Sequence, residues 1–158
     1  MKGFFVTGTD TGVGKTVIAA ALIKAAGLLG VKACAMKPVE TGCTREGNVM
    51  VPSDGMFLKE IAHMDETVSH VTPCCFEHDL APMVSAEMEG TSVDINRIRG
   101  AFDKLGRTYQ AIIVEGVGGL LVPLNRDYFV LDLAREMGLP LVVVARPGLG
   151  TINHTLLT

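Results

Sequence analysis

A glycine-rich segment at residues 8–16, GTDTGVGKT, constrains the fold of this chain more than any other feature of its sequence. A short apolar run at residues 3–7 precedes it, and an alanine-rich run at residues 16–29 follows it and stops at Gly30. This pattern predicts a strand, a tight turn and a helix. It is the context in which a phosphate-binding loop occurs.

The residue types in this loop suit a nucleotide. Consecutive backbone N–H groups and the start of the helix can hold phosphate oxygens, Lys15 can reach the β and γ phosphates, and the Thr16 hydroxyl can bind Mg²⁺. The first glycine stands at Gly8, one residue earlier than the standard spacing from Gly14 requires, so the loop is a variant of the motif. The alternative interpretation is an ordinary glycine turn that contains Gly-Lys-Thr by chance.

The rest of the chain continues the alternation of strands and helices. We expect a loop at 40–52, a less regular stretch at 64–90, and helices from Asp54 to about His63, from Asp94 towards Gly106 and at 130–137. Strands are expected at 31–37, 111–115 and 141–145. Their β-branched content favours a sheet covered on both faces. The predicted fold class is α/β, doubly wound, a mostly parallel sheet flanked by helices in a single domain over residues 1–158.

Composition excludes several classes of function. With 14 Lys and Arg against 17 Asp and Glu, the net charge is −3, so nucleic acid is not an expected partner. No apolar run approaches the roughly 18 residues of a membrane span and no signal-peptide pattern is present, so we expect no membrane partner and a cytoplasmic protein. The four cysteines and four histidines lack the spacing of metal ligands. The sequence stops inside a helix that has just begun, so we expect a chain truncated at its C-terminus.

Three charged residues outside the loop are candidates for chemistry. Glu115 ends an apolar strand, where open α/β sheets place ligands and where nucleotide hydrolases keep a carboxylate for Mg²⁺. Lys37 ends another strand at the same edge and could add a second cation, or could be a solvated strand-end lysine. Asp54 either caps its helix or binds metal. The glycines at 116–119 allow backbone to approach a ligand, or only turn the chain.

Five blocks in order resemble the dethiobiotin synthetase family over essentially the whole chain. They are the loop at 8–16, Lys37-Pro38, Ser53-Asp54, VEGVGG at 114–119 and GLGTINH at 148–154. The resemblance implies a P-loop NTPase fold and a homodimer that uses ATP, Mg²⁺ and CO₂ to close 7,8-diaminononanoate into the cyclic urea dethiobiotin, giving ADP and phosphate.

The same resemblance assigns roles to individual residues. It implies catalytic Lys15 and Lys37, and metal ligation by Thr16, Asp54 and Glu115. Nucleotide contacts are implied for Thr11, Gly12, Val13, Gly14, Lys15, Thr16, Val17, Asp54, Glu115, Gly116, Val117 and Gly118. Substrate contacts are implied for Thr41, Gly148, Leu149, Gly150 and Asn153, with the segment from 148 onwards reaching across the dimer interface. Gly12 departs from the Glu that is frequent in relatives, and Thr41 stands where some carry Ser.

Two rival interpretations belong to other classes. A nucleotide-dependent switch or partitioning ATPase would carry a second lysine early in the loop, but Asp10 occupies that position. An amidotransferring synthase of the cobyric-acid type would need a glutaminase cysteine and histidine in an added domain, for which this chain has no room.

Overall fold

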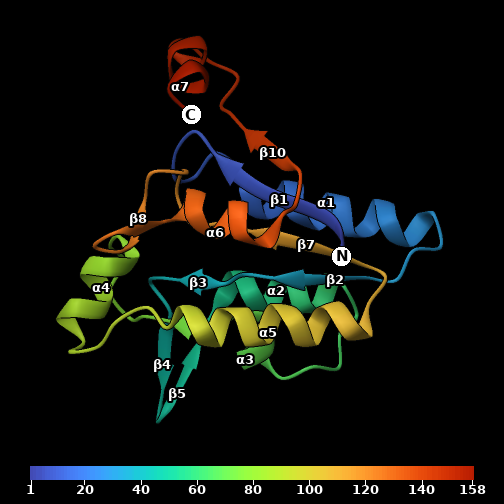
Figure 1. Cartoon of the computed structure of the whole chain (residues 1–158), viewed down its shortest axis with the longest axis horizontal. Coiled ribbons are helices and arrows are strands. Elements are labelled where there is room, and N and C mark those ends of the chain that lie inside the picture. The colour runs from blue at the N-terminus through green and yellow to red at the C-terminus, as the bar shows by residue number, and fades with distance from the viewer.

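A computed structural model describes residues 1–158, and its centre is a parallel sheet of four strands (Figure 1). The strands are β1 (Lys2–Gly8), β2 (Ala33–Met36), β7 (Ala111–Glu115) and β10 (Leu141–Val144), in the order β10-β1-β7-β2. All of β2, the last four residues of β1 and the last four of β7 are buried. β1 therefore lies inside the sheet, and the loop that follows it emerges at the carboxyl edge shared by all four strands.

Helices cover both faces of this sheet, as predicted for a doubly wound α/β fold (Figure 1). On one face lie α1 (Lys15–Leu28) and α2 (Ser53–Ile61), which contact each other and β2. On the opposite face lie α5 (Ile95–Thr108) and α6 (Val130–Met137), coloured yellow and orange in Figure 1. A continuous apolar core joins the layers and includes Phe5, Met36, Leu58, Ile98 and Ile112, each fully buried.

The helix ends agree with their sequence signals. Gly30 follows α1 with φ of 74°, and Gly138 follows α6 with φ of 63°; glycine adopts this left-handed conformation more easily than other residues. At the start of α5 the Asp94 carboxylate accepts a hydrogen bond from Arg97 N at 2.9 Å. The predicted helix from Asp94 is confirmed with this N-cap.

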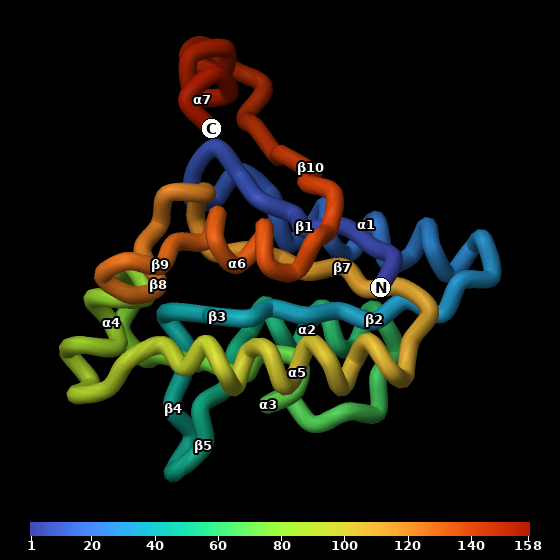
Figure 2. Tube along the Cα trace, viewed as in Figure 1, coloured from blue at the N-terminus to red at the C-terminus, as the bar shows by residue number.

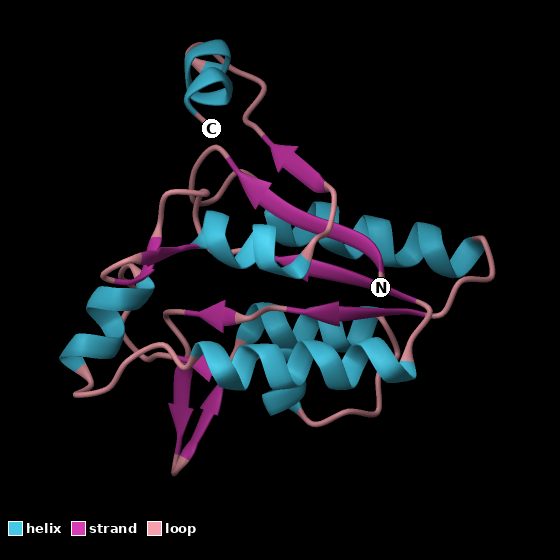
Figure 3. Ribbon diagram, viewed as in Figure 1, coloured by secondary structure: helices cyan, strands magenta, loops and turns pink.

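The prediction of a loop at 40–52 is wrong, and the less regular stretch at 64–90 contains three short elements. The expected loop at 40–52 begins with β3 (Val39–Glu40) and contains the antiparallel pair β4 (Thr44–Glu46) and β5 (Val49–Val51), drawn as magenta arrows in Figure 3. β4 is exposed throughout, so no apolar and polar alternation marked it. The stretch at 64–90 holds α3 (Val68–Val71), β6 (Cys74–Cys75) and α4 (Pro82–Met88), and β6 pairs in parallel with β3. These elements are too short to give a periodic pattern.

The C-terminal part of the chain is less covered than predicted. After a small hairpin of β8 (Pro123–Asn125) and β9 (Tyr128–Phe129), the chain returns through α6 and β10 to α7 (Thr151–Leu157), which stands away from the body (Figure 2). Leu141 and Val143 on the edge strand β10 remain more than two-fifths exposed, so the sheet is not buried on both faces there. None of the helices is long and apolar enough to cross a lipid bilayer.

Candidate active site

The loop between β1 and α1 forms the floor of the candidate site. Gly12 and Gly14 have φ of 69° and 100°, which side chains with a Cβ rarely adopt. No side chain caps α1, so the backbone N–H groups of its first turn have no side-chain partner from within the loop. The strand, turn and helix predicted from the sequence therefore bring a glycine-rich backbone and a helix N-terminus together, an arrangement that suits an anion.

Lys15 is held inside this loop. Its side chain is buried, and its Nζ donates a hydrogen bond to the Asp10 carbonyl at 2.9 Å. Burial lowers the pKa of Lys15, and the positive charge of Lys37 lowers it further. Arg146, which follows β10, donates to the Thr11 carbonyl at 3.0 Å and lies 3.5 Å from the Asp10 carboxylate. No local pattern in the sequence indicates Arg146, because these contacts join residues more than 130 positions apart.

Four predicted residues converge beside the loop. Thr16 Oγ1 donates to Glu115 Oε1 at 2.9 Å, and Lys37 Nζ donates to the same oxygen at 2.6 Å and to Asp54 Oδ2 at 3.1 Å. They come from α1, the end of β7, the end of β2 and the first turn of α2. Lys37 is therefore no solvated strand-end lysine, since its side chain is 5% exposed and carries two ion pairs.

The charge of Lys37 is stabilised by its partners. Burial disfavours the charged form of its ammonium group, but the carboxylates of Glu115 and Asp54 together outweigh burial and raise its pKa. Lys37 is consequently a fixed cation at the carboxyl edge of the sheet. Lys15 and Lys37 thus place two positive groups at one end of the central strands.

The oxygen donors in this cluster fit Mg²⁺. Glu115 is 1% exposed, and its Oε2 atom is a buried acceptor without a hydrogen-bond partner. Thr16 and Asp54 add a hydroxyl and a carboxylate within the same group of contacts. The chain has no cluster of three or more His, Cys, Asp or Glu residues arranged for a metal. Mg²⁺ characteristically binds one or two carboxylates together with substrate phosphates, so this donor set suits it in the presence of a nucleotide.

Asp54 does not cap α2, which corrects the capping alternative. It lies within the first turn, and its carboxylate accepts from Lys37 instead. The cap comes from Glu40, whose Oε1 accepts from Asp54 N and whose Oε2 accepts from Gly55 N, both at 2.9 Å. Burial raises the pKa of Glu40 despite these two N–H bonds. Sequence reasoning missed Glu40, which stands three residues after Lys37 with no local pattern to indicate its partners.

These groups open into a cleft of about 720 Å³. Most predicted nucleotide residues line it, with Lys37, Thr41 and Glu40: Thr11, Gly12, Gly14, Lys15, Thr16, Val17, Asp54, Glu115, Val117 and Gly118. The segment at 79–82 also lines the cleft and was not predicted. Val13 and Gly116 are the predicted nucleotide residues that do not line the cleft. Val13 packs against the apolar core, and a Cβ at Gly116 would lie 2.9 Å from the Phe5 ring.

The predicted substrate segment lies outside this cleft. Gly148, Leu149, Gly150 and Asn153 are all exposed, and none of them lines the cleft formed by the same chain. Thr41 is the predicted substrate residue that does line it.

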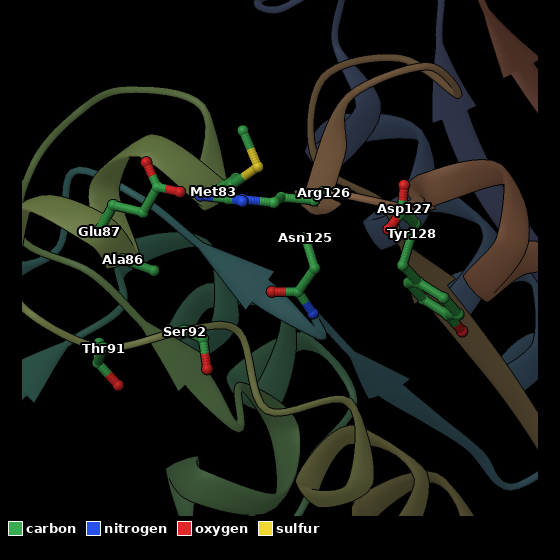
Figure 4. A pocket seen from close by; sticks show the side chains of 9 residues that line it. All are labelled: Met83, Ala86, Glu87, Thr91, Ser92, Asn125, Arg126, Asp127 and Tyr128. Carbon is green, nitrogen blue, oxygen red and sulfur yellow. The ribbon is translucent and has the colours of Figure 1, made fainter.

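A second hollow, of about 460 Å³, lies between α4 and the β8–β9 hairpin (Figure 4). It contains none of the predicted site residues. Two of its polar side chains already serve local structure: Asn125 donates to the Val93 carbonyl at 3.2 Å, and the Tyr128 hydroxyl donates to Glu136 at 2.7 Å. The cleft at the loop is therefore the candidate active site.

Comparison with known proteins shows which family the chain resembles. A family model described as an AAA domain, a P-loop family, matches residues 2–158. The ATP-dependent dethiobiotin synthetase of Thermodesulfovibrio yellowstonii is 48% identical over 99% of this chain and 68% of its own length. The enzymes of the same name from Anaeromyxobacter dehalogenans and Methanococcus vannielii are 47% and 40% identical over 100% and 98% of the chain, and each is covered over 69% of its length.

Proposed function

The chain belongs to the dethiobiotin synthetase family, and from that premise we propose that it uses ATP and CO₂ to close 7,8-diaminononanoate into dethiobiotin, releasing ADP and phosphate. One observation carries the proposal: the phosphate loop and the Lys37–Glu115–Asp54 cluster open into one cleft. A reaction that joins a carboxylated amine to a phosphate needs cations and anion-binding backbone at a single place.

The chemistry divides into three steps. One amine of the substrate captures CO₂ as a carbamate and loses a proton. A carbamate oxygen attacks the γ phosphorus as the bond to ADP breaks, which gives a carbamic-phosphoric anhydride. The second amine then attacks the carbonyl carbon, expels phosphate and closes the five-membered urea. Each step moves negative charge, so positioning and charge stabilisation supply most of the catalysis.

The side chains of the cleft match those needs. The loop backbone and the start of α1 would orient the phosphates, with Lys15 at the β and γ oxygens and Lys37 beside the transferred group. Mg²⁺, held by Thr16, Asp54 and Glu115, would neutralise charge on the phosphate oxygens when bound. The cleft needs no nucleophilic side chain, because the substrate supplies both nucleophiles.

We also propose that the working unit is a homodimer with shared sites, each subunit being one nucleotide-binding domain over residues 1–158. The support is that the segment at 148–153, which the family resemblance assigns to substrate, is exposed and lies outside the cleft of its own chain. A second copy could bring it to that cleft. Thr41, which lines the cleft, would then contact substrate from the first subunit.

The test is whether ATP cleavage depends on both co-substrates together. We expect purified protein with Mg²⁺ and ATP to release phosphate rapidly only when bicarbonate and 7,8-diaminononanoate are both present, and mass spectrometry to detect dethiobiotin in equal amount. Phosphate release that ignores the diamine and bicarbonate would instead favour a nucleotide switch and overturn the proposal.

A further inference from the structure

We propose that Glu40 is a positioning residue of the reaction, which fixes the Asp54 carboxylate beside Lys37 by holding the first turn of α2. The inference rests on the proposed function, because it concerns the place of Asp54 in the Mg²⁺ and nucleotide site. Glu40 itself would touch neither the metal nor the phosphates. It acts through the backbone of Asp54 and Gly55.

The first turn of α2 lacks a cap of its own. Pro52 occupies the N-cap position and has no side-chain oxygen to accept a hydrogen bond. The two backbone N–H groups that an N-cap side chain would satisfy are those of Asp54 and Gly55. Each is bound by a different oxygen of Glu40, at 2.9 Å, and the Ser53 hydroxyl donates to Oε1 at 3.3 Å. One remote carboxylate therefore holds three consecutive residues.

Glu40 is itself anchored. It is 4% exposed, and its carbonyl accepts from Phe76 N at 2.9 Å, next to its pairing with Cys75 across β3 and β6. A Cβ at Gly55 would lie 1.9 Å from Thr72 Oγ1 and 3.5 Å from Glu40 Oε2. The first turn of α2 therefore packs closely against both residues.

The Asp54 side chain depends on this backbone for its position. Its carboxyl group is 41% exposed, and Lys37 is its one hydrogen-bond partner. Apart from the ion pair with Lys37, no side-chain hydrogen bond fixes it. If the first turn moves, the carboxylate moves with it, away from the place where it meets Lys37 and the metal.

Glu40→Gln is the direct test, since glutamine keeps the shape but offers one acceptor and one NH₂ group where two N–H donors must be bound. The quantity to measure is the factor by which Mg²⁺ tightens ADP binding, taken from calorimetric dissociation constants in Mg²⁺ and in EDTA. We expect Glu40→Gln to reduce this factor about 10- to 100-fold, the usual effect of losing a residue that orients a metal ligand. ADP binding in EDTA should stay close to that of the wild type.

Two further variants separate positioning from general destabilisation. Asp54→Asn should lower the Mg²⁺ factor, and the double variant Glu40→Gln/Asp54→Asn should lower it no further, because both changes act on one ligand. Leu58→Ala removes a buried side chain of α2 without touching the cap, and should lower the melting temperature while leaving the factor unchanged. If circular dichroism shows that Glu40→Gln does not fold, Gly55→Ala takes its place. Its methyl group would clash with Thr72 Oγ1 and displace the same turn, and it should give the same loss of the Mg²⁺ factor.

Three results would overturn the inference: an unchanged Mg²⁺ factor in folded Glu40→Gln or Gly55→Ala, additive losses in the double variant, or no tightening of ADP by Mg²⁺ in the wild type. Dethiobiotin formation by the wild type is measured in a separate assay. If no dethiobiotin forms, the proposed function is wrong, whereas the factor by which Mg²⁺ tightens ADP binding tests only the role of Glu40.

Discussion

Lys37 is a buried cation, and the groups around it stabilise its charge. A buried ammonium is costly unless it is paired and hydrogen-bonded. Glu115 and Asp54 supply both conditions, at 2.6 and 3.1 Å. Because Thr16 shares the same Glu115 oxygen, the cluster links the end of β2, the end of β7 and the start of α1 through one atom.

Lys15 and Thr16 are the side chains proposed to hold the phosphates and the metal, and removing either should slow turnover severely. We expect Lys15→Ala or Thr16→Ala to lower kcat about a hundredfold to thousandfold, equivalent to about 3 to 4 kcal/mol, because one preorganised stabiliser of the transferred charge is lost. The assay is phosphate release at saturating ATP, Mg²⁺ and diamine. Near-wild-type turnover in both variants would remove the phosphate-loop assignment. Lys24→Ala, on the exposed side of α1, is the control and should be fully active.

Glu115→Gln should weaken the response to Mg²⁺ while the protein still folds. The amide oxygen can continue to accept from Lys37 and Thr16, but it lacks the charge that a hard cation needs. We expect the half-saturating Mg²⁺ concentration for activity to rise about tenfold or more. Circular dichroism checks the fold. An unchanged Mg²⁺ titration would mean that Glu115 is structural.

The sequence predicts the role of a residue where its place in a loop or at the end of a strand is enough to indicate that role. Lys15 and Thr16 follow from the loop, and Glu115 and Lys37 from their place at the carboxyl ends of strands, since parallel strands end at one edge. Glu40 could not be found this way, because its role arises from contacts to α2 rather than from its neighbours in sequence. The same reason explains why capping remained an alternative role for Asp54 in the sequence.

At the scale of elements, long helices and buried strands were predictable and short exposed pieces were not. β7 and α6 have the predicted bounds, because an apolar run and an apolar face leave a clear pattern over five or eight residues. The β4–β5 hairpin has little buried surface and therefore leaves no such pattern in the sequence. In the sequence it lies between Thr41 and Asp54, two residues of the cleft, so the missed elements connect parts of the site.

The N-cap of α5 offers a test of an element in isolation from the site. Asp94→Ala removes the acceptor for Arg97 N and should lower the free energy of unfolding by about 1 kcal/mol. Asp103→Ala, an equal change of charge on the exposed side of the same helix, should alter it by less than about 0.5 kcal/mol. Urea unfolding followed by circular dichroism measures both. Equal effects of the two substitutions would show that the capping bond contributes nothing.

At the scale of the whole molecule, α7 is the element that its own chain explains least. Ile152, Leu156 and Leu157 of this helix and Leu149 just before it are all at least 72% exposed, and no residue of α7 is buried. Exposed apolar side chains grouped together typically mark a surface that packs against other polypeptide. The position of the 148–153 segment outside the cleft of its own chain motivates the shared-site homodimer.

Complementation between two inactive variants tests that arrangement. Lys37→Ala removes a cation from the cleft of one subunit. Gly150→Glu puts a bulky negative charge at the start of α7, in the 148–153 segment that would contact substrate in the cleft of the other subunit, and it should repel the carboxylate of the substrate. Each variant alone should be inactive. If the two groups come from different subunits, a mixed dimer has one doubly damaged site and one intact site. Random pairing makes about half of the dimers mixed, so equal co-refolding should recover about a quarter of wild-type activity.

The control for this experiment is the mixture of the same two variants refolded separately, which should stay inactive if subunits do not exchange during the assay. Mass spectrometry of the intact complexes measures the fraction of mixed dimers. Mixed dimers without activity would place Lys37 and the 148–153 segment in the same subunit and sink the shared-site proposal. Full activity in a purely monomeric protein would also overturn the shared-site proposal. Each chain would then form a complete site without the α7 segment of a second subunit.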